Sequence, residues 1–375
     1  MSEALTGLEL RSTVTSGGEL QLTLAEVTLD PPGPDEVIVR VEAAPINPSD
    51  LGLLLGPADI ATMKAGGTAD RPTLTATIPP QRMRAMTARL DEPMPVGNEG
   101  AGTVVQAGEN ARHLLGKKVG MIGGAMYTQY RKLPARDVII LPEGASAADG
   151  ASMFVNPLTA LGFVETMRAE GHKAIVHTAA ASNLGQMLNK ICLADSIPLV
   201  NIVRNDVQAA ILRGIGATHI VDSSAPDFEA VLADAIAETG ATIGFDAIGG
   251  GKLAGQILNA MEVAANRNAT GYSRYGSTTY KQVYIYGMLD PGPTIINRTF
   301  GFSWGLCGWL LTPFLMKAGE EVIARLRQRV ADELKTTFAS HYTATISLAD
   351  ALRPEIVEAY ERKTTGEKYL IDPSA

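Results

Sequence analysis

A loop at residues 177–185, HTAAASNLG, follows an apolar run and precedes a helix-like stretch. In dinucleotide-binding folds this place holds three glycines, for a tight turn, for close approach of the backbone to the pyrophosphate and for helix packing. The three positions here are Ala180, Ser182 and Gly185. Alanine and serine are the next smallest residues, and a helix N-terminus presents free N–H groups to an anion. The loop is a candidate pyrophosphate site, although an ordinary strand–helix turn has the same outline.

The next apolar run ends in Val203-Arg204-Asn205. An NAD-binding protein usually carries an acidic residue near this point, where it accepts hydrogen bonds from the ribose hydroxyls. A guanidinium would instead bind a 2′-phosphate. Arg204 therefore favours NADPH over NADH, and the alternative is a solvated arginine at a strand end.

The elements that must position this loop show two different patterns of apolar residues along the chain. Before about residue 150, short β-branched runs are broken by proline and glycine, which predicts a compact, mostly β unit. Beyond residue 155, strand-like runs alternate with helical periodicity, which predicts a doubly wound parallel sheet of the Rossmann type. The fold class is therefore α/β with a second, mostly β part. The stretch 57–95 is too long for an idle loop and is expected to be a lid or pocket wall.

Composition limits the partners. The 375 residues carry a net charge of −8, which argues against nucleic acid or an anionic membrane as the main partner. Two cysteines, Cys192 and Cys307, exclude a disulfide scaffold and fit a reducing compartment. The charged first residues lack a signal-peptide core, and the apolar stretch 300–316 is glycine-bearing and short for a membrane span. We therefore expect a cytoplasmic protein in which 300–316 is buried or forms an interface.

Taken together and in order, the motifs resemble the medium-chain dehydrogenase/reductase superfamily, and within it the zinc-free NADPH:quinone oxidoreductase-like branch. Each motif alone is generic, but their joint order and spacing over most of residues 30–370 are specific. The motifs are Asn47-Pro48-Ser49-Asp50, Gly97-Asn98-Glu99-Gly100, Tyr127-Thr128-Gln129-Tyr130, Asn156-Pro157-Leu158-Thr159, the 177–185 loop, Phe245-Asp246-Ala247-Ile248 and Thr365-Gly366-Glu367-Lys368.

The resemblance implies a GroES-like catalytic domain over 1–154 and 338–375 and a Rossmann domain over 155–337, with the nicotinamide in a cleft between them. Asn47 and Thr159 would line the nicotinamide end, and Arg204 would bind the adenosine phosphate. The remaining implied cofactor contacts are Ala180, Ser182, Asn183, Leu184 and Gly185 at the pyrophosphate, and Ala247, Ile248, Gly249, Tyr286, Gly287 and Met288 at the carboxyl ends of later strands.

Departures from the family pattern limit the chemistry. Asn47 and Asn98 stand where zinc-dependent members have a cysteine and a histidine, so we expect no catalytic zinc. Related enoyl reductases carry a proton-donating tyrosine soon after the Asn-Pro-x-Asp motif, and here that stretch has none, which leaves the catalytic residues unknown. Tyr127 and Tyr130 are interpreted as structural. His177 is interpreted as a buried histidine with satisfied hydrogen bonds.

Three further tyrosines, Tyr272, Tyr275 and Tyr280, lie within a polar insertion at 267–282. This insertion precedes a strand, so it is expected at the opposite end of the sheet from the cofactor.

The predicted reaction is hydride transfer from NADPH to a small-molecule electron acceptor, either a quinone or a carbon–carbon double bond conjugated to a carbonyl. The missing tyrosine favours the quinone slightly, because a reduced quinone needs less help from a protein acid. The alternative is a non-catalytic NADPH-binding or sensing protein of the same fold. An apolar edge around 299–304 predicts a homodimer.

Overall fold

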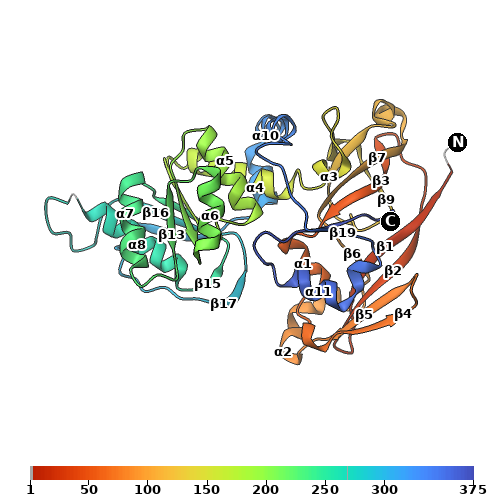
Figure 1. Ribbon diagram of the computed structural model, residues 1–375, viewed down its shortest axis with the longest axis horizontal. Coiled ribbons are helices and arrows are strands. Elements are labelled where there is room, and N and C mark those ends of the chain that lie inside the picture. The colour runs from red at the N-terminus through yellow and green to blue at the C-terminus, as the bar shows by residue number, and fades with distance from the viewer. Residues whose placement is uncertain (1–2, 268) are drawn as a thin grey trace. The chain divides into compact units, whose positions relative to one another are not determined.

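The computed structural model describes residues 3–267 and 269–375. It divides into two compact units, Met1–Val155 with Arg327–Ala375, and Asn156–Leu326 (Figure 1). The division falls within α10 (Glu320–Asp332), whereas the sequence analysis placed it after residue 337. The expected domain boundaries stay a prediction.

Unit 1 holds two β-sheets. The five-stranded sheet has the order β4-β5-β2-β1-β6, and the seven-stranded sheet has the order β10-β8-β7-β3-β20-β19 with β9 also paired to β3. The strands are β1 (Leu5–Val14), β2 (Glu19–Leu29), β3 (Glu36–Pro45), β4 (Lys64–Gly67), β5 (Pro72–Thr77), β6 (Met94–Pro95), β7 (Glu99–Ala107), β8 (Lys118–Ile122), β9 (Tyr130–Pro134), β10 (Val138–Ile140), β19 (Ala344–Ile346) and β20 (Tyr369–Ile371).

Short helices connect these strands. The α-helices are α1 (Pro48–Leu54), α2 (Pro80–Met83), α3 (Ala147–Gly150) and α11 (Pro354–Glu361), and the 3-10 helices are η1 (Ile60–Thr62), η2 (Arg84–Arg89), η3 (Glu109–Leu114), η4 (Ala135–Asp137) and η5 (Asp350–Leu352). The mostly β character predicted for this part of the chain is confirmed.

The stretch 57–95 contains regular secondary structure that packs within unit 1. Its strand β5 pairs antiparallel with β2, opposite Leu22 and Leu20, and alternation buries Leu74 and Ala76 against the same core. A period-2 pattern with one apolar face forms a half-buried strand, so this part of the stretch extends the sheet. Its role in shaping an acceptor pocket stays a prediction.

Unit 2 is a six-stranded sheet of order β13-β12-β11-β14-β16-β18, in which every pairing is parallel. This confirms the doubly wound arrangement. Its strands are β11 (Ile175–His177), β12 (Leu199–Val203), β13 (His219–Asp222), β14 (Ile243–Asp246), β16 (Lys281–Ile285) and β18 (Trp304–Gly308), and β15 (Gly249–Gly251) pairs with β17 (Asp290–Thr294) apart from them.

Helices cover both faces of this sheet. They are α4 (Val155–Ala169), α5 (Asn183–Ala194), α6 (Asp206–Ile215), α7 (Phe228–Thr239), α8 (Leu253–Asn266) and α9 (Leu311–Ala318). Val176 and Val200 pack with α7 and α8, which lie side by side in Figure 1. His177 and Phe245 alternate to the opposite face, where the Phe163 ring of α4 stacks on Phe245 at 4.0 Å between centroids.

The apolar stretch 300–316 becomes the edge strand β18 followed by α9. Phe300 is fully buried, and Phe302 and Met316 are 78% and 81% exposed, so one part of the stretch is buried and an interface for the exposed part stays a prediction. Among the described residues, no helix has the length and apolar character needed to cross a bilayer.

Candidate cofactor and acceptor site

The predicted phosphate loop joins β11 to α5. Ser182 caps the helix, because its hydroxyl oxygen accepts from the Gly185 N–H at 3.2 Å, and its own proton remains available to donate. Ala179 has a φ of 48°, a left-handed conformation that costs a non-glycine residue on the order of 1 kcal/mol. Asn183 begins the helix and Leu184 is almost buried. The loop is thus a built turn that opens directly into a helix N-terminus.

Gly185 is the fingerprint glycine that packing requires. A Cβ at this position would overlap the carbonyl oxygen of Ala180, on the turn that enters the helix. Ala180 is fully buried, and its N–H donates to the Ile202 carbonyl of β12 at 3.2 Å. The chain therefore retains glycine where helix and strand approach most closely and replaces it at the other two positions.

Arg204 lies directly after β12, at the same edge of the sheet as this loop, because β11 and β12 are parallel neighbours. Its backbone N–H donates to the Gln208 side chain at 2.9 Å, and the Asn205 side chain caps α6. The Arg204 residue is exposed, and its guanidinium has no hydrogen-bond or ion-pair partner among the described residues. It is placed to bind an anion.

The loop after β14 is tied to the loop after β11 by Asp246, which is fully buried. The Thr178 hydroxyl donates to the Asp246 carboxylate at 2.8 Å and accepts from the Ala247 N–H at 2.8 Å. The same carboxylate accepts from the N–H groups of Ile248 and Gly249. These two backbone groups are therefore used within the loop, and the network holds both turns in one arrangement.

Residues 286–288 continue from β16 at this edge. Gly287 lies against Ala247 so closely that a Cβ would meet the Ala247 carbonyl oxygen, and Met288 is 72% exposed. The Tyr286 hydroxyl lies 2.8 Å from Nε2 of His177. Thr159, on α4, is buried. The family resemblance implies only that Tyr286 lies along the cofactor, and the apolar strand before it gives no signal of the contact with His177.

The interpretation of His177 needs a correction. The ring is fully buried as expected, but Nδ1 has no hydrogen-bond partner among the described residues, so the histidine is only half satisfied. Burial lowers the pKa of His177 to about 3, which keeps the imidazole neutral. Tyr127 agrees with its structural interpretation: it is fully buried and donates to the Pro45 carbonyl at 3.0 Å.

In unit 1, Asn47 lies at the start of α1 and is 1% exposed. Its Nδ2 donates to Oε1 of Glu99 at 2.8 Å, and its Oδ1 has no partner among the described residues. The other oxygen of Glu99 accepts from the backbone N–H groups of Phe154 and Val155, each at 2.9 Å. Asn47 thus keeps an unused acceptor, and a buried acceptor of this kind suits a ligand N–H donor.

A set of buried charges surrounds Asn47. Burial raises the pKa of Asp50 to about 7, and burial lowers the pKa of Lys368 to about 8 despite the attraction of Glu99 and Asp50. The Lys368 ammonium donates to the Ser152 hydroxyl at 2.7 Å. The sequence motifs contain these residues but do not predict that they cluster, since β20 and β3 join only in the folded sheet.

No group of three or more histidine, cysteine, aspartate or glutamate side chains is placed to hold a metal within the described ranges 3–267 and 269–375. At the two positions compared with zinc ligands, Asn47 bonds Glu99 and Asn98 Nδ2 donates to the Ser49 hydroxyl at 3.0 Å. The absence of a catalytic zinc stays a prediction for experiment.

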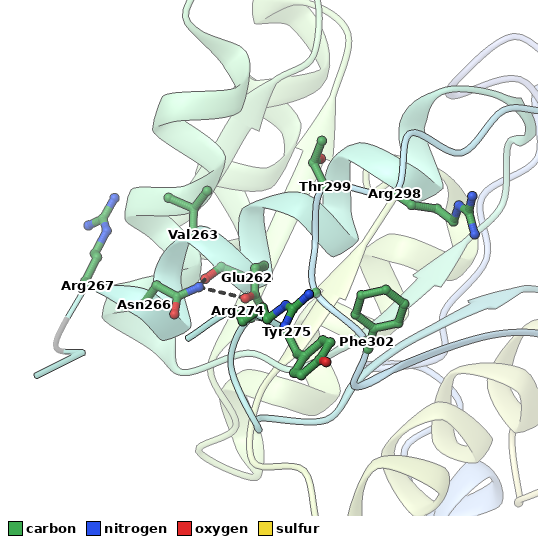
Figure 2. A pocket seen from close by; sticks show the side chains of 11 residues that line it. Glu262, Val263, Asn266, Arg267, Arg274, Tyr275, Arg298, Thr299 and Phe302 are labelled. Carbon is green, nitrogen blue, oxygen red and sulfur yellow. Dashed lines mark hydrogen bonds between the residues drawn. The ribbon is translucent and has the colours of Figure 1, made fainter. Parts of the chain in front are cut away.

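A cavity of about 550 Å³ lies elsewhere in unit 2, beside the 267–282 insertion. Figure 2 shows Tyr275 and Phe302 facing one another there, while Arg267 and Arg298 point away to opposite sides. The Glu262 carboxylate fastens the insertion by accepting from Ser277 and Lys281. These segments precede β16 and β18, so the cavity is at the amino ends of the strands and the loops described above are at the carboxyl ends.

Comparison with known proteins agrees with this arrangement. Residues 33–143 match the model of the alcohol dehydrogenase GroES-like domain. A crystal structure of a Mesorhizobium loti protein, described as a candidate NADPH:quinone reductase, is 27% identical, with a TM-score of 0.72 and coverage of 100% of this chain and 99% of the other.

Curated relatives include mitochondrial enoyl-[acyl-carrier-protein] reductases. That of Xenopus tropicalis is 29% identical over 53% of this chain, and the match spans 51% of the frog protein. Enoyl-[acyl-carrier-protein] reductase 2 of Candida tropicalis is 23% identical over 92% of this chain and 86% of the yeast protein. The chain spans about half the length of the frog relative that it matches.

The family resemblance is therefore confirmed at the level of the GroES-like domain, the Rossmann sheet and their order along the chain. The GroES-like domain model and the structural neighbour that covers the full chain thus support the medium-chain dehydrogenase/reductase superfamily, in its zinc-free, quinone reductase-like branch.

Proposed function

We propose that this protein is an NADPH-dependent oxidoreductase that reduces a small, electron-poor acceptor. The observation that carries the proposal is the pairing of the capped β11–α5 turn with Arg204 at the carboxyl edge of one parallel sheet. A helix N-terminus suits a pyrophosphate, and an unpaired guanidinium beside it suits a second phosphate. The Mesorhizobium loti relative adds support through its described cofactor.

The residues present fit such a cofactor. Ser182, Asn183 and Leu184 would meet the pyrophosphate, with Ala180 and Gly185 shaping the turn. Asn47 and Thr159 would hold the nicotinamide end, where the unused Oδ1 of Asn47 can accept from an amide N–H. Further contacts would come from Ala247, Ile248, Gly249, Tyr286, Gly287 and Met288.

The cofactor supplies a hydride when bound, and the chain supplies the positioning of the reactants. An enoyl acceptor takes the hydride at its β-carbon, and the electron pair of its double bond moves through the conjugated system onto the carbonyl oxygen. A quinone that takes the hydride becomes a hydroquinone anion, whose charge lies on oxygen. Solvent then provides the proton that completes the reduction. Both acceptor classes stay in the proposal, because relatives are named for quinone reduction and for enoyl reduction.

The test combines binding and turnover. Fluorescence titration should give tighter binding of NADPH than of NADH, and NADPH oxidation should be followed against a panel of quinones and 2-enoyl thioesters, with and without a chelator. We expect turnover with at least one acceptor that is insensitive to the chelator. Binding without turnover on the whole panel would favour the non-catalytic alternative, and activity lost to the chelator and restored by zinc would contradict the metal-free mechanism.

We also propose that the protein is a homodimer. The strand β18 is an edge strand of the unit 2 sheet, and Phe302 and Leu310 beside it are exposed. An open edge with apolar neighbours is a surface that proteins usually cover.

A further inference from the structure

Tyr286 and His177 form a hydrogen-bonded pair at the end of the unit 2 sheet. They lie on β11 and just after β16, separated by the central strand β14, and their rings are stacked 5.8 Å apart between centroids. The pair has an inner member, His177, that is fully buried, and an outer member, Tyr286, that is partly exposed.

The hydrogen-bond pattern decides which atom carries the proton between them. The neutral imidazole has one N–H, and Nδ1 has no partner within the part of the chain that the structure describes. A proton on Nδ1 would leave a buried donor without an acceptor, which is rarer in proteins than an unused acceptor. The proton is therefore assigned to Nε2, which donates to the Tyr286 oxygen at 2.8 Å.

This assignment leaves the phenol proton of Tyr286 free to donate to another acceptor. The phenol also stays protonated, because burial and the nearby Asp246 carboxylate raise the pKa of Tyr286 above its ordinary value. Such a group is a neutral hydrogen-bond donor throughout the working pH range, suited to an oxygen on which negative charge develops.

The neighbouring packing places this donor beside the proposed reaction centre. The Phe163 ring packs edge-on against Tyr286, with centroids 4.7 Å apart. Phe163 lies one helical turn after Thr159 on α4, and residues four apart share a helix face. Thr159 is the residue of this unit that the proposed function assigns to the nicotinamide.

We propose that Tyr286, oriented by His177, donates the hydrogen bond that stabilises the acceptor's carbonyl oxygen while hydride adds at carbon. This inference rests on the proposed function, and it fills the role for which the sequence offered no tyrosine after the Asn-Pro-x-Asp motif. Tyr286 is a catalytic residue in this proposal and His177 is a positioning residue. No bond to the protein forms, and solvent supplies the final proton.

The test is Tyr286→Phe, which keeps the ring and removes only the hydroxyl, with Tyr284→Phe as the matched control. Tyr284 lies two residues earlier, on β16, and its hydroxyl donates to Glu170 at 2.6 Å. We expect kcat to fall on the order of 10²-fold in Tyr286→Phe. NADPH affinity should change less than about threefold, and the primary isotope effect with 4-deuterated NADPH should rise. Tyr284→Phe should leave kcat and the isotope effect unchanged.

His177→Gln and His177→Leu separate orientation from packing. The glutamine amide can still donate to the phenol and should retain more of the kcat than leucine, which cannot. Equal losses in both variants would overturn the positioning role.

Two further outcomes would be decisive. The hydrogen-bonding role alone is overturned if wild type turns over and Tyr286→Phe has the same kcat. It is also overturned if Tyr286→Phe loses NADPH affinity while its kcat stays unchanged. A wild-type protein that binds NADPH and reduces no acceptor overturns the proposed function, and the role of Tyr286 with it.

Discussion

Arg204 is the residue on which, in our proposal, the preference for NADPH over NADH depends. The guanidinium is exposed and unpaired among the described residues, at the end of a strand next to the phosphate loop. A 2′-phosphate can accept charge-assisted hydrogen bonds from it, and a ribose hydroxyl gains little from a cation. Exposure to solvent reduces the gain to about that of a single such bond.

We predict that Arg204→Ala weakens NADPH binding roughly ten- to a hundredfold and leaves NADH binding nearly unchanged. Arg204→Asp should invert the preference, because a carboxylate repels the phosphate and accepts from ribose hydroxyls. Fluorescence titration with both cofactors measures this, with Arg213→Ala, an exposed arginine on α6, as control. Equal weakening of both cofactors by Arg204→Ala would show that the residue supports the fold.

Lys368 is the residue whose titration should appear in the stability of the protein. Its pKa is lowered to about 8 in the folded chain by burial, from an ordinary value of 10.5. Between these two values the unfolded chain binds a proton that the folded chain does not, so stability rises with pH across this window. Asp50 acts with the opposite sign, because its raised pKa makes stability fall between about pH 4 and 7.

We predict that Lys368→Met removes the Lys368 part of this dependence. The wild type should gain stability relative to the variant as pH rises from 8 to 10.5, by no more than about 1.4 kcal/mol per pH unit. Urea unfolding at several pH values measures the difference, and Lys117→Met, at an exposed lysine, is the control. Parallel pH profiles for wild type and Lys368→Met would mean that the ammonium is solvated.

At the scale of elements, the β11–α5 unit depends on how closely a helix can approach a strand. Gly185 permits that approach, because any Cβ there would overlap the Ala180 carbonyl. Ala180 is in turn bonded to β12, so the turn cannot shift without breaking a backbone hydrogen bond between neighbouring elements. The other two fingerprint positions hold Ala180 and Ser182, so a side chain fits there.

We predict that Gly185→Ala destabilises the protein by about 1–3 kcal/mol and weakens NADPH binding, because the helix N-terminus must move away from the turn. Gly214→Ala is the matched control. Gly214 lies within α6, where an added Cβ meets nothing within 4 Å, and alanine there should stabilise by up to about 1 kcal/mol. Thermal unfolding and cofactor titration of both variants measure these effects; a Gly185→Ala variant of wild-type stability would contradict the packing argument.

At the scale of the whole molecule, one edge of the unit 2 sheet is unpaired among the described residues. The edge strand β18 has β16 on one side, and no strand among the described residues pairs with its other side. Cys307 and Gly308 are exposed on this strand. A second copy of the chain, pairing edge to edge, would satisfy these backbone groups and cover nearby apolar side chains.

We predict that wild type sediments as a dimer and that Cys307→Lys sediments as a monomer at micromolar concentration. Symmetric edge pairing would bring the two introduced charges close together, and lysine on an edge strand is a common means of preventing such pairing. Cys307→Ser tests the loss of the thiol alone and should remain dimeric. A monomeric wild type would refute the dimer, and a dimeric Cys307→Lys would place the interface elsewhere.

Much of this protein could be predicted from the sequence, because the responsible physics is local. Apolar spacing with periods of 2 and 3.6 determined where the mostly β unit ends and where the alternation of parallel strands and helices begins. The small residues of the 177–185 loop predicted a pyrophosphate site, and Arg204 after the next strand predicted a 2′-phosphate site at the same edge of the sheet. These features require only neighbours in sequence and the rule that parallel strands end together.

The tertiary structure alone decided which distant groups meet. Asn47 donates a hydrogen bond to Glu99 because β3 and β7 are paired. Lys368 lies near both residues because β20 pairs with β3. His177 meets Tyr286 across the intervening β14. No local pattern records such pairings, because burial sets both the hydrogen-bond partners and the pKa values, and burial depends on how elements far apart in the chain pack together.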